Sequence, residues 1–232
     1  MRMMRPILVV LAMLIPAMAT AADLKSEVVS IGGVQAILMT PAKPHGAIVL
    51  MSGGDGEFAI DAKGETASNN SLVRNRAAFA ARGFAVLSPE GNIDVTAAVT
   101  FMRTYGHVTL AGTSRGTQRA ARGIAAGARP DRLVLTSGFL SNASGDSDNV
   151  IAILGSPALL PPTLVVHNRQ DGCNKTLPAG VEPFMAWAGA KARLVWLQGG
   201  TSVGNPCQSL AYHGFNGIDG PMVGAVAGFA LH

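Results

Sequence analysis

The sequence has few charged and few aromatic residues, which make up 14% and 5% of its 232 positions. No cluster of Lys and Arg interleaved with aromatic residues occurs, so nucleic acid is not expected as a partner. No acidic tail or disordered tract is evident, and hydrophobic residues account for 48% of the chain. This composition and length predict one globular domain over residues 23–232, with a core large enough for an α/β fold.

Long hydrophobic runs are also scarce, and only one stands out. It covers residues 6–18, follows the basic start Met1–Arg5, and is followed by small residues up to Ala22. This order is typical of a secretory signal peptide over residues 1–22, cleaved near Ala22, and predicts a periplasmic or secreted protein. An uncleaved membrane anchor is the alternative, although the run is shorter than the ~20 residues that span a bilayer. No later run is long enough to span a membrane.

Cysteine is limited to Cys173 and Cys207. An even pair in an exported chain favours a disulfide, because the compartments outside the cytoplasm are oxidising. Metal ligation would need His or carboxylate neighbours at short spacing, and these are not evident, so no metal is expected. Free buried thiols remain the alternative. Such a disulfide would link the loop of the candidate acid to the segment that leads into the loop of the candidate base, both of which are described below.

Apolar strand-like segments alternate with helix-compatible ones along the chain. The strand-like segments are 24–30, 34–39, 47–51, 84–87, 107–111, 132–136, 163–167 and 192–197, and the helix-compatible ones are 69–82, 94–105, 117–128, 178–190 and 221–231. An opening hairpin followed by repeated βα units predicts a mostly parallel sheet of about eight strands with helices on both faces. Residues 139–162 are irregular and too few for a substantial cap.

The motif Gly112-Thr-Ser114-Arg-Gly116 lies between a predicted strand and a predicted helix. A serine at such a sharp turn is typical of a nucleophile, because glycines on both sides allow the close backbone approach that the turn demands. An ordinary βα turn is the alternative. A nucleophilic serine needs a base, and the base needs an acid, so the sequence must supply a histidine and a carboxylate.

His213 is the best candidate for the base among five histidines. His45 precedes a strand and His107 opens one, so both are expected at the opposite edge of the sheet, while His167 lies in or at the end of a strand and His232 ends the chain. His213 lies in the loop between the last predicted strand and the last helix. A surface histidine without a catalytic role is the alternative.

Asp171 is the best candidate for the acid, because it closely follows the strand 163–167 and ligands gather at the carboxyl ends of parallel strands. A plain Asp-Gly turn also fits these residues. Asp146 and Asp148 are weaker rivals from the irregular segment.

An oxyanion hole needs two backbone N–H groups. Arg115 supplies the first, at the start of a helix where the dipole favours negative charge. The Gly-rich turn 52–58 supplies the second, from Gly54 or Asp55. A Gly-rich turn without a catalytic role is the alternative. The turn lacks the spacing of a phosphate-binding loop.

The sequence resembles the α/β-hydrolase superfamily, and especially small exported or dienelactone-hydrolase-like esterases. Three features carry the resemblance: the sharp turn at Ser114, the chain order Ser114, Asp171, His213, and the Gly-rich turn. The resemblance implies a serine hydrolase with a minimal cap and no cofactor, which cleaves a small or soluble ester or thioester through an acyl-enzyme. Ser52-Gly53-Gly54-Asp55 departs from the His-Gly-Gly-Gly loop of lipases and makes lipase activity doubtful. The alternatives are a non-catalytic binding protein of this fold, or a peptidase or lactonase that uses the same triad.

Overall fold

The computed structural model describes residues 24–232, so the predicted signal peptide lies outside the described residues. Eight strands form one sheet in the order β1-β2-β4-β3-β5-β6-β7-β8. The strands are β1 (Leu24–Ile31), β2 (Val34–Pro41), β3 (Gly46–Met51), β4 (Phe84–Pro89), β5 (Val108–Thr113), β6 (Arg132–Thr136), β7 (Thr163–Asn168) and β8 (Ala192–Leu197). Strand β2 pairs antiparallel with β1 and β4, and the strands from β4 to β8 are parallel. The mostly parallel sheet of eight strands confirms the predicted fold class.

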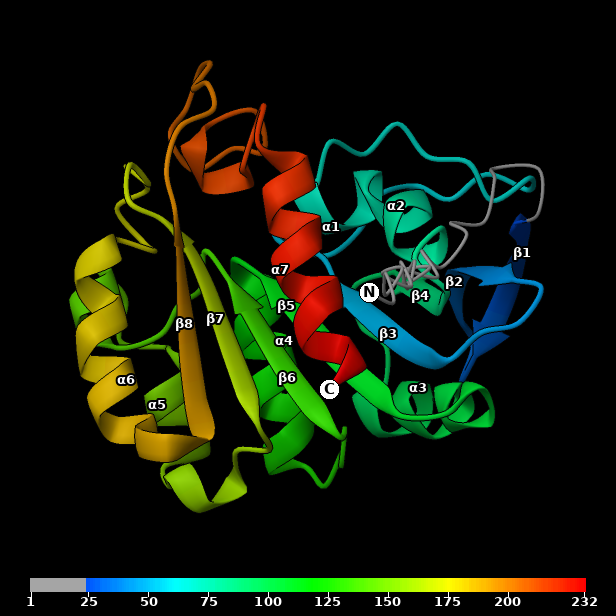
Figure 1. Cartoon of the computed structure of the whole chain (residues 1–232), viewed down its shortest axis with the longest axis horizontal. Coiled ribbons are helices and arrows are strands. Elements are labelled where there is room, and N and C mark those ends of the chain that lie inside the picture. Colours follow the sequence, from blue (N-terminus) through cyan, green and yellow to red (C-terminus); the bar gives the residue numbers. More distant parts are fainter. Residues whose placement is uncertain (1–23) are drawn as a thin grey trace, which may run out of the picture.

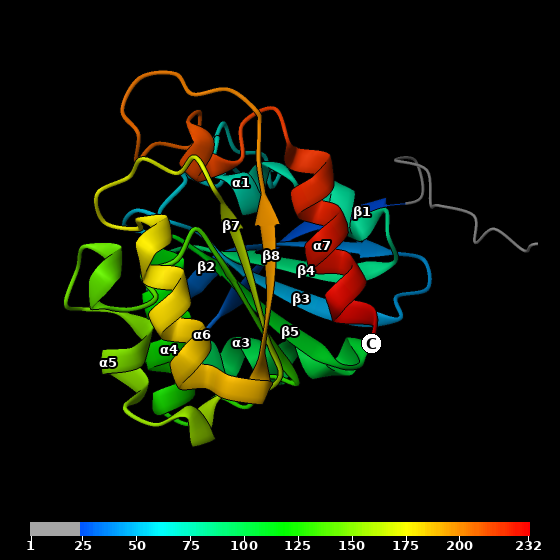
Figure 2. The same ribbon diagram turned by 60° about the vertical axis from the view of Figure 1, so that its left-hand side comes forward.

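Helices cover both faces of the sheet, as Figure 2 shows. They are α1 (Ser71–Arg74), α2 (Arg76–Ala80), α3 (Val95–Met102), α4 (Arg115–Ala125), α5 (Val150–Leu154), α6 (Val181–Ala188) and α7 (Asp219–Leu231). One core cluster joins the sheet to α3, α4, α5 and α6, and the other joins it to α1, α2 and α7. Within β3, Val49 belongs to the first cluster and Ile48 to the second, because successive side chains of a strand point to opposite faces.

The predicted helix over 69–82 is broken into α1 and α2 at Asn75. The Asn75 side chain donates a hydrogen bond to Ser71 O at 2.8 Å. An asparagine that bonds to nearby backbone competes with the helical hydrogen-bond pattern, which accounts for the break. The hydrophobic positions of both pieces still face the sheet, since Leu72 and Phe79 are fully buried.

The loops that follow the parallel strands lie at the carboxyl ends of these strands, along the upper edge of the sheet in Figure 1. The loop after β3, the turn from β5 to α4, the loop after β7 and the long loop after β8 all lie there. This edge contains Ser114, Asp171 and His213, as expected from their places in the sequence. No helix among residues 24–232 has both the length and the apolar character that a membrane crossing requires.

We predict that Gly123→Ala destabilises the fold, because a Cβ at Gly123 in α4 would lie 2.4 Å from Val95 Cβ in α3. Overpacking of this kind costs about 1–3 kcal/mol, more than the ~1 kcal/mol that alanine gains over glycine in a helix. Gly224→Ala in α7 is the matched control, because nothing lies within 4 Å of its added Cβ. Urea unfolding measures both, and equal stabilities of the two variants would contradict the prediction.

Candidate active site

Ser114 occupies a strained backbone conformation between β5 and α4, with φ 53° and ψ −127°. This region is rarely adopted by residues other than glycine and costs of order 1–3 kcal/mol. Two close approaches explain why glycines flank it. A Cβ at Gly112 would lie 2.6 Å from Gly116 O, and a Cβ at Gly116 would lie 2.1 Å from Met51 O. The turn therefore has the geometry that the motif predicts.

The start of α4 presents unpaired backbone N–H groups beside Ser114. Arg115 is the first residue of the helix, and the first N–H groups of an α-helix have no acceptor within it. Ser114 N donates to Thr136 O at 3.1 Å, and Thr117 Oγ1 donates to Ser114 O at 2.6 Å. These bonds fix both peptide groups of the serine and leave its side chain at the helix N-terminus.

The Gly-rich turn after β3 lies directly against the serine. A Cβ at Gly53 would lie 3.1 Å from Ser114 Cβ, so the turn packs against the serine side chain at this glycine. Gly54 has a φ of +62°, and its carbonyl accepts a hydrogen bond from Arg119 at 3.0 Å. Arg119 also donates to Ser52 O. The predicted donors Gly54 and Asp55 line the cavity described below, together with Gly53, which the sequence did not distinguish from its neighbours.

His213 and Asp171 form a buried pair. His213 Nδ1 lies 3.0 Å from Asp171 Oδ2, and both side chains are at most 5% exposed. Thr176 Oγ1 donates to Asp171 Oδ2 at 3.1 Å and lies 2.9 Å from His213 Nδ1. The other carboxylate oxygen, Oδ1, accepts the backbone N–H of Cys173 at 2.9 Å. Asp171 therefore has partners on both oxygens, and His213 is held through the nitrogen that faces them.

A second histidine, His167 in β7, lies on the same carboxylate. Its Nε2 is 3.4 Å from Asp171 Oδ2, and its ring is completely buried. Burial on its own would raise the pKa of Asp171, but its interactions with the nearby rings of His167 and His213 lower it to about 2. Asp171 is thus an anion at neutral pH. Neither His167 nor Thr176 lies in a motif, so their contacts with Asp171 are not predicted from the sequence.

The remaining histidines and the rival acids have other partners. His107 lies 3.5 Å from Asp131, and His45 packs edge-on against Phe84 at the opposite edge of the sheet. Asp148 pairs with Arg122 at 2.6 Å, and Asp146 pairs with Lys175 at 3.2 Å. These contacts exclude them from the His213 pair.

Ser114 and His213 line one open cavity of about 480 Å³. Its walls come from the Gly-rich turn, from residues 68–71 and from the loop after β8. Its lining side chains are mostly polar, with Asp55, Asn70 and Gln208 among them, while Val203 and Leu210 are its large apolar residues. Among residues 24–232, no aromatic side chain lines it. The cavity thus suits a small polar molecule better than a long hydrocarbon chain.

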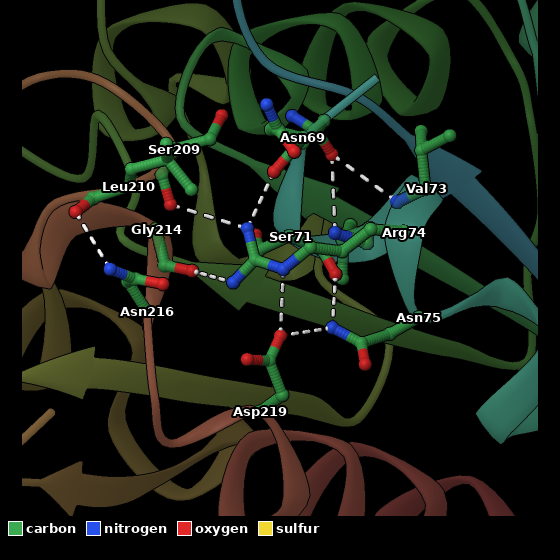
Figure 3. A network of polar contacts seen from close by, with 12 residues as sticks. Asn69, Ser71, Val73, Arg74, Asn75, Ser209, Leu210, Gly214, Asn216 and Asp219 are labelled. Carbon is green, nitrogen blue, oxygen red and sulfur yellow. Dashed lines mark hydrogen bonds and ion pairs between the residues drawn. The ribbon is translucent and has the colours of Figure 1, made fainter. Parts of the chain in front are cut away.

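Arg74 ties two walls of this cavity together, as Figure 3 shows. Its guanidinium donates to Asn69 O at 2.5 Å on one wall, and to Ser209 O at 3.2 Å and Gly214 O at 2.7 Å on the other. It also pairs with Asp219 at 2.8 Å, at the start of α7. A half-buried arginine with four acceptors fixes the loop that carries His213 against α1. Ser137 Oγ adds a hydrogen bond to His213 O at 2.7 Å.

Cys173 and Cys207 form a disulfide. It joins the loop of Asp171 to the loop after β8, where Cys207 lines the cavity. The acid's loop and a wall of the cavity are therefore covalently linked. No cluster of three His, Cys, Asp or Glu side chains suited to a metal ion occurs within residues 24–232.

Comparison with solved structures identifies the architecture. The chain superposes on EstE5, a protein crystallised with p-nitrophenyl butyrate soaked in, with a TM-score of 0.57, 14% identity and coverage of 93% of this chain and 87% of that one. It also superposes on TT1662 from Thermus thermophilus, with a TM-score of 0.58, 14% identity and coverage of 90% and 99%. The chain has the α/β-hydrolase fold.

A third structure of this fold is carboxyl esterase 2 from the fungus Tuber melanosporum, with a TM-score of 0.57, 14% identity and coverage of 91% and 88%. No protein-family model matches the sequence, and no curated protein matches it significantly. The likeness to these structures is therefore one of fold.

We predict that Asp171 makes the protein sensitive to acid. Its pKa is about 2 in the folded protein and ~3.9 in an unfolded chain, so its contribution to stability is present above pH ~4 and is lost as the pH falls towards 2. The contribution is on the order of 2 kcal/mol. Urea unfolding of the wild type and Asp171→Asn at pH 5 and pH 2.5 measures it. The stability advantage of the wild type should shrink at the lower pH, and an unchanged difference would contradict the prediction.

Proposed function

We propose that the protein is a serine hydrolase that cleaves carboxylic esters or thioesters through an acyl-enzyme. The observation that carries the proposal is the placement of a strained Ser114 in one cavity with His213, whose Nδ1 is bound by the ionised Asp171. A strained serine at a strand-to-helix turn, a histidine and a buried acid are the three parts of a nucleophilic triad.

In this mechanism Ser114 Oγ attacks the substrate carbonyl carbon while His213 Nε2 accepts the hydroxyl proton. Asp171 holds the imidazole through Nδ1 and stabilises its positive charge. The carbonyl oxygen becomes an oxyanion, which accepts hydrogen bonds from the N–H of Arg115 and of Gly54 or Asp55. His213 then donates its proton to the leaving alkoxide, and the alcohol departs. Water repeats the sequence on the acyl-enzyme, releases the acid and restores Ser114.

The polar walls of the cavity favour a short acyl group and a soluble substrate. Its apolar residues, Val203 and Leu210, lie in one exposed loop and offer little surface for a long chain. Burial of each CH₂ group is worth about 0.8 kcal/mol only where apolar surface receives it. Carboxyl esterase 2 from Tuber melanosporum has the same fold, which supports the choice of an ester.

We also propose that the protein is exported. The basic start, the short apolar run and the small residues up to Ala22 support cleavage of a leader, and the disulfide between Cys173 and Cys207 fits an oxidising compartment.

Ser114→Ala is expected to abolish labelling of the folded protein by a fluorophosphonate probe and to lower kcat on p-nitrophenyl acetate by a factor on the order of 10⁴ to 10⁶. Mass spectrometry of the labelled peptide identifies the modified residue. Ser209→Ala, a second serine of the same cavity, is the control and should retain labelling. Absence of labelling and of hydrolysis in the wild type would leave a non-catalytic binding protein as the remaining interpretation.

A panel of p-nitrophenyl esters is expected to show highest kcat/KM for acetate to butyrate, with a steep loss beyond about eight carbons, because the walls give long chains no apolar contact. Small peptides and lactones belong in the same panel. Preference for either of these over every ester would replace the esterase assignment with peptidase or lactonase activity.

A further inference from the structure

We propose that the side-chain amide of Asn70 is a third donor to the oxyanion, beside the two backbone N–H groups. The inference rests on the proposed function. Asn70 lines the cavity that contains Ser114. A Cβ placed on Gly53 would lie 3.1 Å from Ser114 Cβ and 3.4 Å from Asn70 Nδ2. Asn70 Nδ2 and the Ser114 side chain therefore both border the space that the missing side chain of Gly53 leaves open.

The orientation of the Asn70 amide follows from its hydrogen bonds. Its Oδ1 caps α1 by accepting the N–H of Leu72 at 3.1 Å and of Val73 at 3.4 Å. Both partners are donors, so the atom that meets them must be the oxygen, and the NH₂ group is the one beside Ser114. Within residues 24–232, Nδ2 has no hydrogen-bond acceptor. Two N–H bonds of this group are thus free to meet a substrate.

The amide is also rigidly placed. Asn70 N donates to Ser68 Oγ at 3.2 Å, and Asn70 O accepts from Arg74 N at 2.8 Å. Leu72 and Val73 anchor α1 in the core, and Arg74 ties the preceding Asn69 carbonyl to the loop of His213. A donor whose position is fixed before the reaction costs no reorganisation when charge develops, which is the condition for effective oxyanion stabilisation.

The oxyanion stands two bonds beyond Ser114 Oγ, on the substrate's carbonyl carbon. Asn70 Nδ2, close to the serine side chain, is placed to donate to that oxygen as its charge grows. The contact strengthens from a neutral carbonyl to an anion, so it stabilises the transition state more than the bound substrate. Its loss is expected to lower kcat and to leave KM nearly unchanged.

The test uses Asn70→Asp and Asn70→Ser, both of which retain an oxygen to cap α1 and remove the NH₂ donor. Asp and Ser are N-caps comparable to Asn, so urea unfolding should be nearly that of the wild type. We expect kcat on p-nitrophenyl acetate to fall roughly 10²-fold in each, with KM within about threefold. Asp94→Ser makes a similar exchange at the N-cap of α3, outside the cavity, and should retain the wild-type kcat.

Inhibition by phenylboronic acid, which forms a tetrahedral anion on a serine, provides a second measurement. Its inhibition constant should rise in parallel with the loss of kcat. An unchanged kcat in either stable variant, or a raised KM at constant kcat, would overturn the role of Asn70. If a variant loses stability, the inhibition constant for phenylboronic acid is measured on its folded fraction, and it tests the role of Asn70 in the same way. A wild type that hydrolyses no ester and takes up no fluorophosphonate would instead refute the proposed function itself.

Discussion

The close backbone contact between the first turn of α4 and the end of β3 is the constraint on which the candidate site depends. Gly116 lies so near the carbonyl groups of Met51 and Ser52 that any side chain there would collide with them. This contact accompanies the sharp turn at Ser114, whose φ of 53° joins the end of β5 to the start of α4. It also brings the Gly-rich turn against the serine side chain, where Arg119 holds two of its carbonyl groups.

The two halves of the site are held by different kinds of interaction. Ser114 follows a central strand, and main-chain packing determines its place. His213 follows a long loop, and side chains hold it instead: Asp171 and Thr176 on the ring, Ser137 on its carbonyl group, and Arg74 on the next residue. The disulfide adds a covalent link between the acid's loop and the cavity wall. The base therefore depends on contacts made by segments far away in the sequence.

This difference explains what the sequence could predict. Strands buried on both faces are continuous apolar runs, so the sequence predicts the bounds of β3 to β7 closely. Ser114 and Asp171 follow the carboxyl ends of two of these strands, which is why the sequence indicates both. The pairing of His213 with Asp171 followed from chain order. The contact of Thr176 with His213 and the bonds of Arg74 are not predicted from the sequence, because they depend on partners up to 145 positions away. No local pattern records such a contact.

The bonds from Arg74 to the loop after β8 end on carbonyl oxygens of Ser209 and Gly214. Main-chain oxygens are present whatever the side chain is, so the tie holds the path of the loop without constraining most of its residues. Apart from the disulfide-bonded Cys207, the residues of 203–210 that face the cavity can therefore vary in chemistry while His213 stays in place. In evolution or in the laboratory, changes in this wall can alter which molecules the cavity admits without disturbing the buried pair of His213 and Asp171 beneath it.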